Sequence, residues 1–219
     1  MSAHVKICGL TRPEDTAVAV ASGADYVGVV FAGGPREIAP EDARAVLEPA
    51  YGRALRVGVF PSADADRIAD YAGVAGLDVA QVHGGKSVSV DEIRAVRTRS
   101  GLAVWAVVRI PGAVLPPADQ LRELFEAADA VLLEAYVPGV LGGTGRQLPW
   151  HELAATLAPI RPHGSTLVLA GGLNPTNVAR AIEALSPDVV DVSSGVEMEP
   201  GVKDHALVRT FIAAARGGI

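Results

Sequence analysis

The sequence is poor in cysteine, in positive charge and in long apolar segments, and each shortage excludes a class of protein. Cys8 is the only cysteine among 219 residues, which excludes an internal disulfide and a multi-cysteine metal site and is typical of a reducing compartment. The chain has 19 Lys and Arg but 25 Asp and Glu, so it has no excess of positive charge that would favour binding to nucleic acid. No apolar stretch approaches membrane-spanning length, and no basic, then apolar, leader opens the chain. We therefore expect a cytoplasmic protein with neither membrane nor nucleic acid as partner.

The chain has instead an apolar content of 49%, arranged as strands that alternate with helices. Short runs rich in β-branched residues predict strands, and Ala-rich or amphipathic segments that follow them predict helices. The predicted strands are Val5–Cys8, Tyr26–Phe31, Leu55–Phe60, Leu77–His83, Leu102–Ile110, Ala130–Glu134, Thr166–Ala170 and Val189–Val192. The predicted helices are Pro13–Ser22, Pro40–Leu47, one from Ser62, Val88–Ser100, Pro117–Ala128, Pro149–Ile160, Asn174–Leu185 with Asn174 as cap and Pro175 at its first position, and Asp204–Ala215.

Eight strand–helix cycles with mostly short connections predict a (β/α)₈ TIM barrel, a single domain over residues 1–219. The alternative is an open doubly wound sheet. That fold places three spaced glycines after its first strand, whereas only Gly9 follows Cys8 here. The barrel is therefore the favoured fold.

Two residues at predicted strand ends could carry acid–base chemistry. Cys8 ends the first strand, where it is either a small buried hydrophobe or a thiolate acting as base or nucleophile. Glu134 ends the sixth strand, where it is either solvated or paired with Arg109, or a proton donor. Because side chains alternate along a strand, Glu134 shares a face with Ala130 and Leu132, and an inward face would bring it toward Cys8.

Three glycine-rich turns in the last third of the chain are candidate phosphate sites. Turns after strands seven and eight of a barrel commonly bind phosphate through backbone N–H groups, which glycine lets approach closely. Each turn alone could be an ordinary loop, but together they favour a small phosphorylated substrate. The candidate phosphate-binding residues are Gly143, Thr144, Gly145, Gly171, Gly172, Ser194 and Gly195.

Further polar residues are expected near the same end of the barrel. Gln81 and His83 share a face of strand four and are candidates for substrate binding, although His83 could equally be structural. Arg36, in the loop above strand two, is a candidate carboxylate clamp. Asp191 lies on strand eight, and Lys6 is interpreted as part of a polar layer inside the barrel. The histidines show no metal-ligand spacing with acidic residues.

With these residues in view, the chain resembles the phosphoribosylanthranilate isomerase family of tryptophan biosynthesis. The resemblance implies a single-domain barrel without metal or organic cofactor, which performs an Amadori rearrangement of N-(5-phospho-β-D-ribosyl)anthranilate. The segments that carry it are Lys6 to Thr11, Gly34 to Arg36, Val57 to Phe60, Gln81 to Gly84, Gly142 to Gly145, Ala170 to Leu173, Asp191 to Glu197 and Gly201 to Asp204.

The resemblance also implies roles for individual residues. Cys8 would be the general base at the sugar C2, and position 134 would supply the acid for the ring oxygen. Arg36 would hold the anthranilate carboxylate and Asp191 would orient the substrate, while the glycine turns would hold its phosphate. The chain departs from the family at Glu134, where aspartate is usual. Glutamate reaches one methylene further, and a catalytic group displaced by about 1 Å can cost on the order of 100-fold in rate.

Two other functions are compatible with this barrel. A related sugar-phosphate isomerase of histidine biosynthesis performs the same rearrangement, but that family typically has aspartate where Cys8 stands. A weakened paralogue that only binds phosphorylated ligands would keep the glycine turns and lose turnover. A monomer and a homodimer are both compatible with the sequence.

Overall fold

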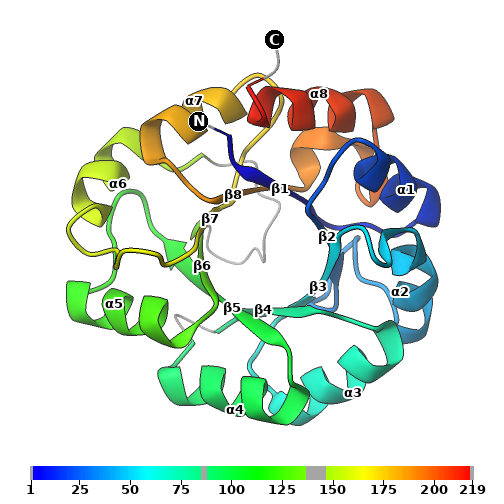
Figure 1. Cartoon of the computed structure of the whole chain (residues 1–219), viewed down its shortest axis with the longest axis horizontal. Helices are drawn as coiled ribbons and strands as arrows, with labels where there is room; N and C mark the ends of the chain where they lie inside the picture. The colour runs from blue at the N-terminus through cyan, green and yellow to red at the C-terminus, as the bar shows by residue number, and fades with distance from the viewer. Residues whose placement is uncertain (1, 85–87, 137–146, 218–219) are drawn as a thin grey trace.

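Eight parallel strands close into a barrel, and helices surround it (Figure 1). This computed structural model describes residues 2–84, 88–136 and 147–217. Neighbouring strands follow chain order from β1 to β8, and β8 returns to pair with β1. The strands are β1 His4–Ile7, β2 Tyr26–Val30, β3 Leu55–Phe60, β4 Val79–His83, β5 Ala103–Ile110, β6 Ala130–Ala135, β7 Leu167–Leu169 and β8 Val189–Val192. The predicted barrel is confirmed.

The connections from each strand to the next carry the helices of the outer ring. Two 3₁₀ turns, η1 Glu48–Ala50 and η2 Ser194–Val196, follow α2 and β8. None of the helices in the described part of the chain has the length and apolar character to cross a membrane. The α-helices are α1 Pro13–Ala21, α2 Pro40–Leu47, α3 Ala65–Ala75, α4 Val90–Ser100, α5 Ala118–Ala127, α6 Trp150–Leu157, α7 Val178–Leu185 and α8 His205–Ala215.

Apolar side chains form two layers because each strand points alternate residues into the barrel and toward the helices. Val5 and Ile7 of β1 pack in the outer layer under the helices, as the alternation predicts, and Lys6 between them points inward and is buried. The barrel interior is filled by Val57, Val79, Trp105, Val107, Ala130, Leu132, Val168, Ala170 and Val189. The interior below the strand ends is therefore a packed core.

Side-chain caps set several helix starts. Ser89 and Glu92 form a reciprocal capping box at α4, and Asp204 accepts hydrogen bonds from two N–H groups of α8. The predicted start of the third helix at Ser62 is wrong, because the Asp64 carboxylate accepts from the Arg67 N–H and caps a helix that begins at Ala65.

The predicted start of α7 is also wrong. Asn174 and Pro175 lie in a turn, and the helix begins at Val178. The Asn174 side chain accepts hydrogen bonds from the Thr176 N–H and hydroxyl, and its backbone carbonyl accepts from the Asn177 and Val178 N–H groups, so a single turn precedes the helix. Asn177 then occupies the cap position, and its amide bridges the Asn174 N–H and the Gly172 carbonyl.

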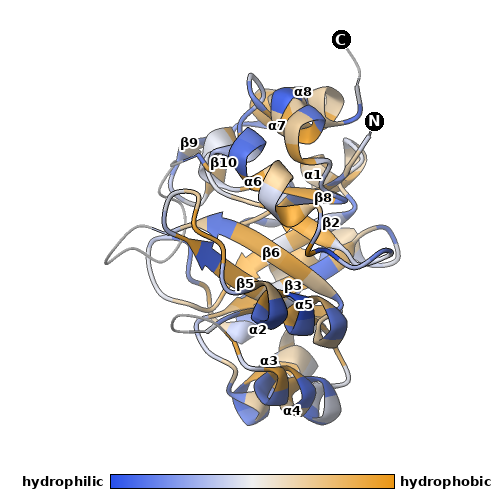
Figure 2. Ribbon diagram, turned by 90° about the vertical axis from the view of Figure 1, so that its left-hand side faces the viewer, coloured by the Kyte–Doolittle hydropathy of each residue, from blue (hydrophilic) through white to orange (hydrophobic). Residues whose placement is uncertain are grey.

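A short hairpin between β8 and α8 adds to the barrel at one end. Its strands, β9 Glu197–Glu199 and β10 Val202–Lys203, pair antiparallel. Figure 2 shows the hairpin at the end toward which the arrows of β5 and β6 point, and those arrows carry hydrophilic colour at their tips. The hairpin therefore lies at the carboxyl ends of the strands, where barrel sites are built.

Candidate functional site

A cavity of about 670 Å³ opens at the carboxyl ends of the strands. Every predicted site residue in the described part of the chain lines it. The predicted turn at Gly143, Thr144 and Gly145 lies outside the described residues. The predicted residues that line the cavity are Cys8, Arg36, Gln81, His83, Glu134, Gly171, Gly172, Asp191, Ser194 and Gly195.

One side of the cavity holds a thiol, an ammonium and a carboxylate. The fully buried Lys6 donates from Nζ to Asp191 Oδ2 at 3.0 Å. Burial disfavours the Lys6 charge, but the attraction of Asp191 and Cys8 outweighs it and raises the pKa of Lys6. Burial raises the pKa of the Cys8 thiol, and the Lys6 ammonium opposes that shift. Lys6 thus stays charged beside the thiol and limits the rise in the pKa of Cys8.

Gly28 of β2 makes room for that arrangement. A Cβ built at Gly28 would lie 3.1 Å from both Cys8 Sγ and Lys6 Cε. Real Cβ atoms seldom come so close, and β-strand neighbours have little freedom to move aside. Glycine at this position therefore lets Cys8 and Lys6 share the space inside the barrel.

Glu134 and Cys8 line the same cavity, and β7 and β8 stand between their strands, β6 and β1, in the ring. Glu134 Oε2 is 3.8 Å from Arg109 Nε and 3.9 Å from His83 Nδ1, too far for hydrogen bonds. Burial raises the pKa of Glu134 to about 6, although Arg109 partly offsets the shift. A carboxyl with that pKa can hold a proton near neutral pH.

His83 is neutral at this site. Burial, with the repulsion of Arg109 and Lys6, lowers the pKa of His83 to about 3. Its Nε2 lies 3.3 Å from the amide Nε2 of Gln81, and an amide nitrogen only donates, so the histidine proton is placed on Nδ1. Nδ1 and the Gln81 Oε1 are buried and have no hydrogen-bond partner among the described residues, as is true of Asp191 Oδ1 and Glu134 Oε2. The side chains that carry these atoms line the cavity.

The turns after β7 and β8 come into close contact. Gly171 and Gly172 have φ of +91° and +66°, a conformation that favours glycine. A Cβ on Gly195 would overlap the backbone carbonyl oxygen of Leu173. The turn after β8 continues into the short helix η2, the arrangement that holds phosphate in many barrels.

Arg36 lines the cavity and is held by a residue that the sequence analysis did not single out. Its Nε and Nη2 donate to the two oxygens of Glu197 at 2.8 and 2.6 Å. Lys203 Nζ donates to the same carboxylate at 2.7 Å. The sequence holds one signal for this segment, the turn pair Pro200–Gly201, but the stretches on either side of it are too short to predict strands.

Together these observations define a (β/α)₈-barrel enzyme with acid–base groups at its mouth. The described residues contain no group of three or more His, Cys, Asp or Glu placed to hold a metal ion. Residues 5–214 match the family described as N-(5'phosphoribosyl)anthranilate (PRA) isomerase. The chain belongs to this family of isomerases.

The chain is similar to individual members of this family over nearly its whole length. The chain is 41% identical to the N-(5'-phosphoribosyl)anthranilate isomerase of Rubrobacter xylanophilus, covering 98% of this chain and 99% of that one. It is 42% identical to the isomerase of Thermotoga neapolitana, with 98% of each covered. The crystal structure of phosphoribosyl anthranilate isomerase from Thermotoga maritima superposes with a TM-score of 0.82 at 36% identity, covering 98% and 99%. A second solved isomerase, at 34% identity, 98% and 99% coverage and a TM-score of 0.79, is in complex with reduced 1-(o-carboxyphenylamino)-1-deoxyribulose 5-phosphate.

Proposed function

We propose that this chain isomerises N-(5-phospho-β-D-ribosyl)anthranilate to 1-(2-carboxyphenylamino)-1-deoxy-D-ribulose 5-phosphate, a step of tryptophan biosynthesis. The observation that carries the proposal is one cavity lined by both the Cys8 thiol and the Glu134 carboxyl. The reaction is an aldose–ketose isomerisation, an intramolecular oxidation at C2 and reduction at C1. It requires one group that donates a proton and one that removes a proton.

Glu134 is the acid in this scheme. With a pKa of about 6, a fraction of the carboxyl is protonated near neutral pH and can protonate the ring oxygen as the C1–O bond breaks. The nitrogen lone pair then forms the C1=N bond of a Schiff base. Arg109 and His83, which flank the Glu134 carboxyl, favour the carboxylate that remains after transfer.

Cys8 is the base. Its thiolate removes the proton from C2, and the C–H electron pair becomes the C1=C2 bond while the C1=N pair returns to nitrogen. The enol then tautomerises, so that C2 becomes the ketone and C1 gains a proton. Lys6, buried beside Cys8 and paired with Asp191, supplies the positive charge that favours the thiolate.

The remaining cavity residues bind the substrate. Arg36 holds the anthranilate carboxylate, while Gln81, His83 and Asp191, which line the same cavity, bind the sugar. The phosphate is bound at the glycine turns by Gly143, Thr144, Gly145, Gly171, Gly172, Ser194 and Gly195.

No cofactor takes part in this scheme, and the proposed location is the cytoplasm. One solved structure is of monomers generated from the dimeric isomerase of Thermotoga maritima. For this chain both a monomer and a homodimer fit the proposal.

The proposal is tested by steady-state turnover of freshly made substrate, followed through the loss of its fluorescence. We expect turnover by the native chain and a loss of roughly 10²–10⁴-fold in Cys8→Ala, since general-base catalysis contributes about that much. Glu134→Asp should retain turnover within about 100-fold, because it keeps the acid and moves it by roughly one bond length.

One outcome would contradict the proposal. If the native chain binds the reduced product but turns over no substrate, while Glu134→Asp restores turnover, the native chain is a binding relative that has lost the geometry of its acid.

A further inference from the structure

The Arg36 side chain is fixed at both ends by the fold. Its aliphatic stem packs against the backbone of Gly9, where an added Cβ would lie 2.6 Å from Arg36 Cδ and 2.8 Å from Ser193 Oγ. Its guanidinium is held side-on by Glu197, whose side chain is only 5% exposed. Two opposed contacts of this kind leave the arginine little rotameric freedom.

The pairing with Glu197 leaves one edge of the guanidinium available. An arginine presents a side-on edge, formed by Nε and Nη2, and an end-on edge, formed by Nη1 and Nη2. Glu197 occupies the side-on edge. No other hydrogen bond engages this guanidinium within residues 2–84, 88–136 and 147–217, and Arg36 lines the cavity. The end-on edge can therefore take a second carboxylate.

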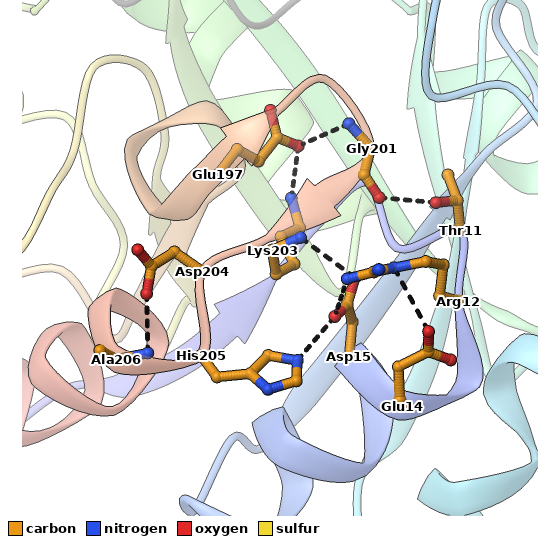
Figure 3. A network of polar contacts seen from close by, with 10 residues as sticks. All are labelled: Thr11, Arg12, Glu14, Asp15, Glu197, Gly201, Lys203, Asp204, His205 and Ala206. Atoms are coloured by element: carbon orange, nitrogen blue, oxygen red, sulfur yellow. Dashed lines mark hydrogen bonds and ion pairs between the residues drawn. The ribbon is translucent and has the colours of Figure 1, made fainter.

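Glu197 is itself braced by the hairpin. Its Oε1 accepts from Lys203 Nζ at 2.7 Å and from the Gly201 N–H at 3.3 Å, as Figure 3 shows. Lys203 Nζ also donates to the Ser193 carbonyl at 3.3 Å, next to the turn at Ser194. The cations Arg36 and Lys203 with the anion Glu197 leave one net positive charge, which suits an anionic ligand.

We propose that Glu197 is a positioning residue that aims Arg36 end-on into the cavity and thereby makes the site select substrates with a carboxylate on the aryl amine. This inference rests on the proposed function and extends it to the residue behind the carboxylate clamp. Glu197 touches no reacting atom. It acts through the orientation of Arg36 and through the charge that it neutralises.

The test measures selectivity for a carboxylate by titration calorimetry. Two ligands are compared: the reduced product 1-(2-carboxyphenylamino)-1-deoxyribulose 5-phosphate, and its counterpart that lacks the carboxyl group. For the native chain we expect the carboxylated ligand to bind roughly 10- to 100-fold more tightly, the range for charge-assisted bidentate hydrogen bonds. Glu197→Gln should lose at least about tenfold of that preference. Glu199→Gln, on an exposed residue of the same hairpin, should keep it.

Binding of the ligand without a carboxyl group distinguishes positioning from a structural role. A structural role would weaken both ligands equally in Glu197→Gln, whereas a positioning role weakens only the carboxylated one. If Glu197→Gln fails to fold, Glu197→Asp is the second variant. It keeps the negative charge but moves the carboxylate that holds Arg36 by about one bond length, so it should also lower the preference for the carboxylated ligand.

Two results would overturn the inference. If Glu197→Gln and Glu197→Asp both keep the native preference for the carboxylated ligand, Glu197 does not position Arg36. The proposed function is then unaffected. Equal binding of both ligands by the native chain means that no carboxylate clamp exists, and then the role proposed for Arg36 fails too.

Discussion

At the residue scale, Glu134 carries a charge that its neighbours only partly compensate. Its pKa rises from 4.5 to about 6 because burial outweighs the attraction of Arg109. A carboxyl whose pKa is raised in the folded state destabilises the fold once it ionises. The ionised Glu134 carboxylate therefore lowers the stability of the fold at neutral pH. The same rise in pKa leaves a fraction of Glu134 protonated there, so it has a proton to donate.

This cost should be measurable in Glu134→Gln. A shift of this size corresponds to about 2 kcal/mol, present as stability below pH 4.5 and lost as the pH rises through about 6. Glutamine resembles the protonated acid and does not titrate, so the variant should gain about 2 kcal/mol over the native chain between roughly pH 4 and pH 8. Urea unfolding at both pH values checks this, with the exposed Glu126→Gln as control. A pH-independent difference would contradict the assigned pKa.

Alternation along the strands predicted the site at this scale. It placed Cys8 and Glu134 at one cavity because the side chains at parallel strand ends converge there. It could not predict the partner of Arg36, since Glu197 is 161 residues away in the chain. Lys6 was correctly expected inside the barrel, but its pairing with Asp191, 185 residues away, depends on closure of the ring.

At the scale of the element, the turns after β7 and β8 depend on their close approach. Gly195 lies against the Leu173 carbonyl with no space for a side chain. The two turns together form the proposed phosphate site, so a change in either should affect both stability and substrate binding.

Gly195→Ala is expected to destabilise the fold by roughly 1–3 kcal/mol, the usual cost of overpacking, and to raise KM for the phosphorylated substrate. Gly73→Ala is the matched control. Gly73 lies inside α3 with no atom close to its would-be Cβ, so alanine there should stabilise by roughly 0.5–1 kcal/mol and leave KM unchanged. Denaturant titration and steady-state kinetics check both. A Gly195→Ala chain with native KM would argue against phosphate binding at this turn.

Most elements could be predicted from sequence because barrel strands are runs of β-branched residues bounded by turn residues. The start of α7 could not, because a single turn closed by Asn174 precedes the helix, and its sequence resembles a first helical turn. The β9–β10 hairpin was missed because its strands are too short for a clear alternation.

At the scale of the whole molecule, the two ends of the chain are joined to each other. β1 pairs with β8, and α1 is tied to the segment that leads into α8 through Asp15 (Figure 3). The fully buried Asp15 carboxylate accepts from Arg12, from the Lys203 N–H at 3.1 Å and from His205 Nε2 at 2.8 Å. Burial acts to raise the pKa of Asp15, but these hydrogen bonds lower it below 3.8.

Asp15→Asn should therefore destabilise the fold by roughly 1.5–3 kcal/mol at neutral pH, the range for hydrogen bonds to a charged group. Since the native pKa is lowered, this stability is present above pH 3.8 and is lost as the pH falls through the lower folded-state value. Urea unfolding measures the difference, with the exposed Asp70→Asn as control, for which a change within about 0.5 kcal/mol is expected. Equal effects of the two substitutions would show that the barrel closes without Asp15.

In the proposed reaction, the cavity residues remove a proton from C2 of a phosphoribosyl arylamine and leave a ketone there. The most direct measurement is carbon NMR of N-(5-phosphoribosyl)anthranilate labelled with ¹³C at C2, incubated with the native chain and with Cys8→Ala. We expect the native chain to move the C2 signal from the alcohol to the ketone region, and Cys8→Ala to leave it in place over the same time. Release of anthranilate without a C2 ketone, or conversion by Cys8→Ala at the native rate, would contradict the proposed reaction.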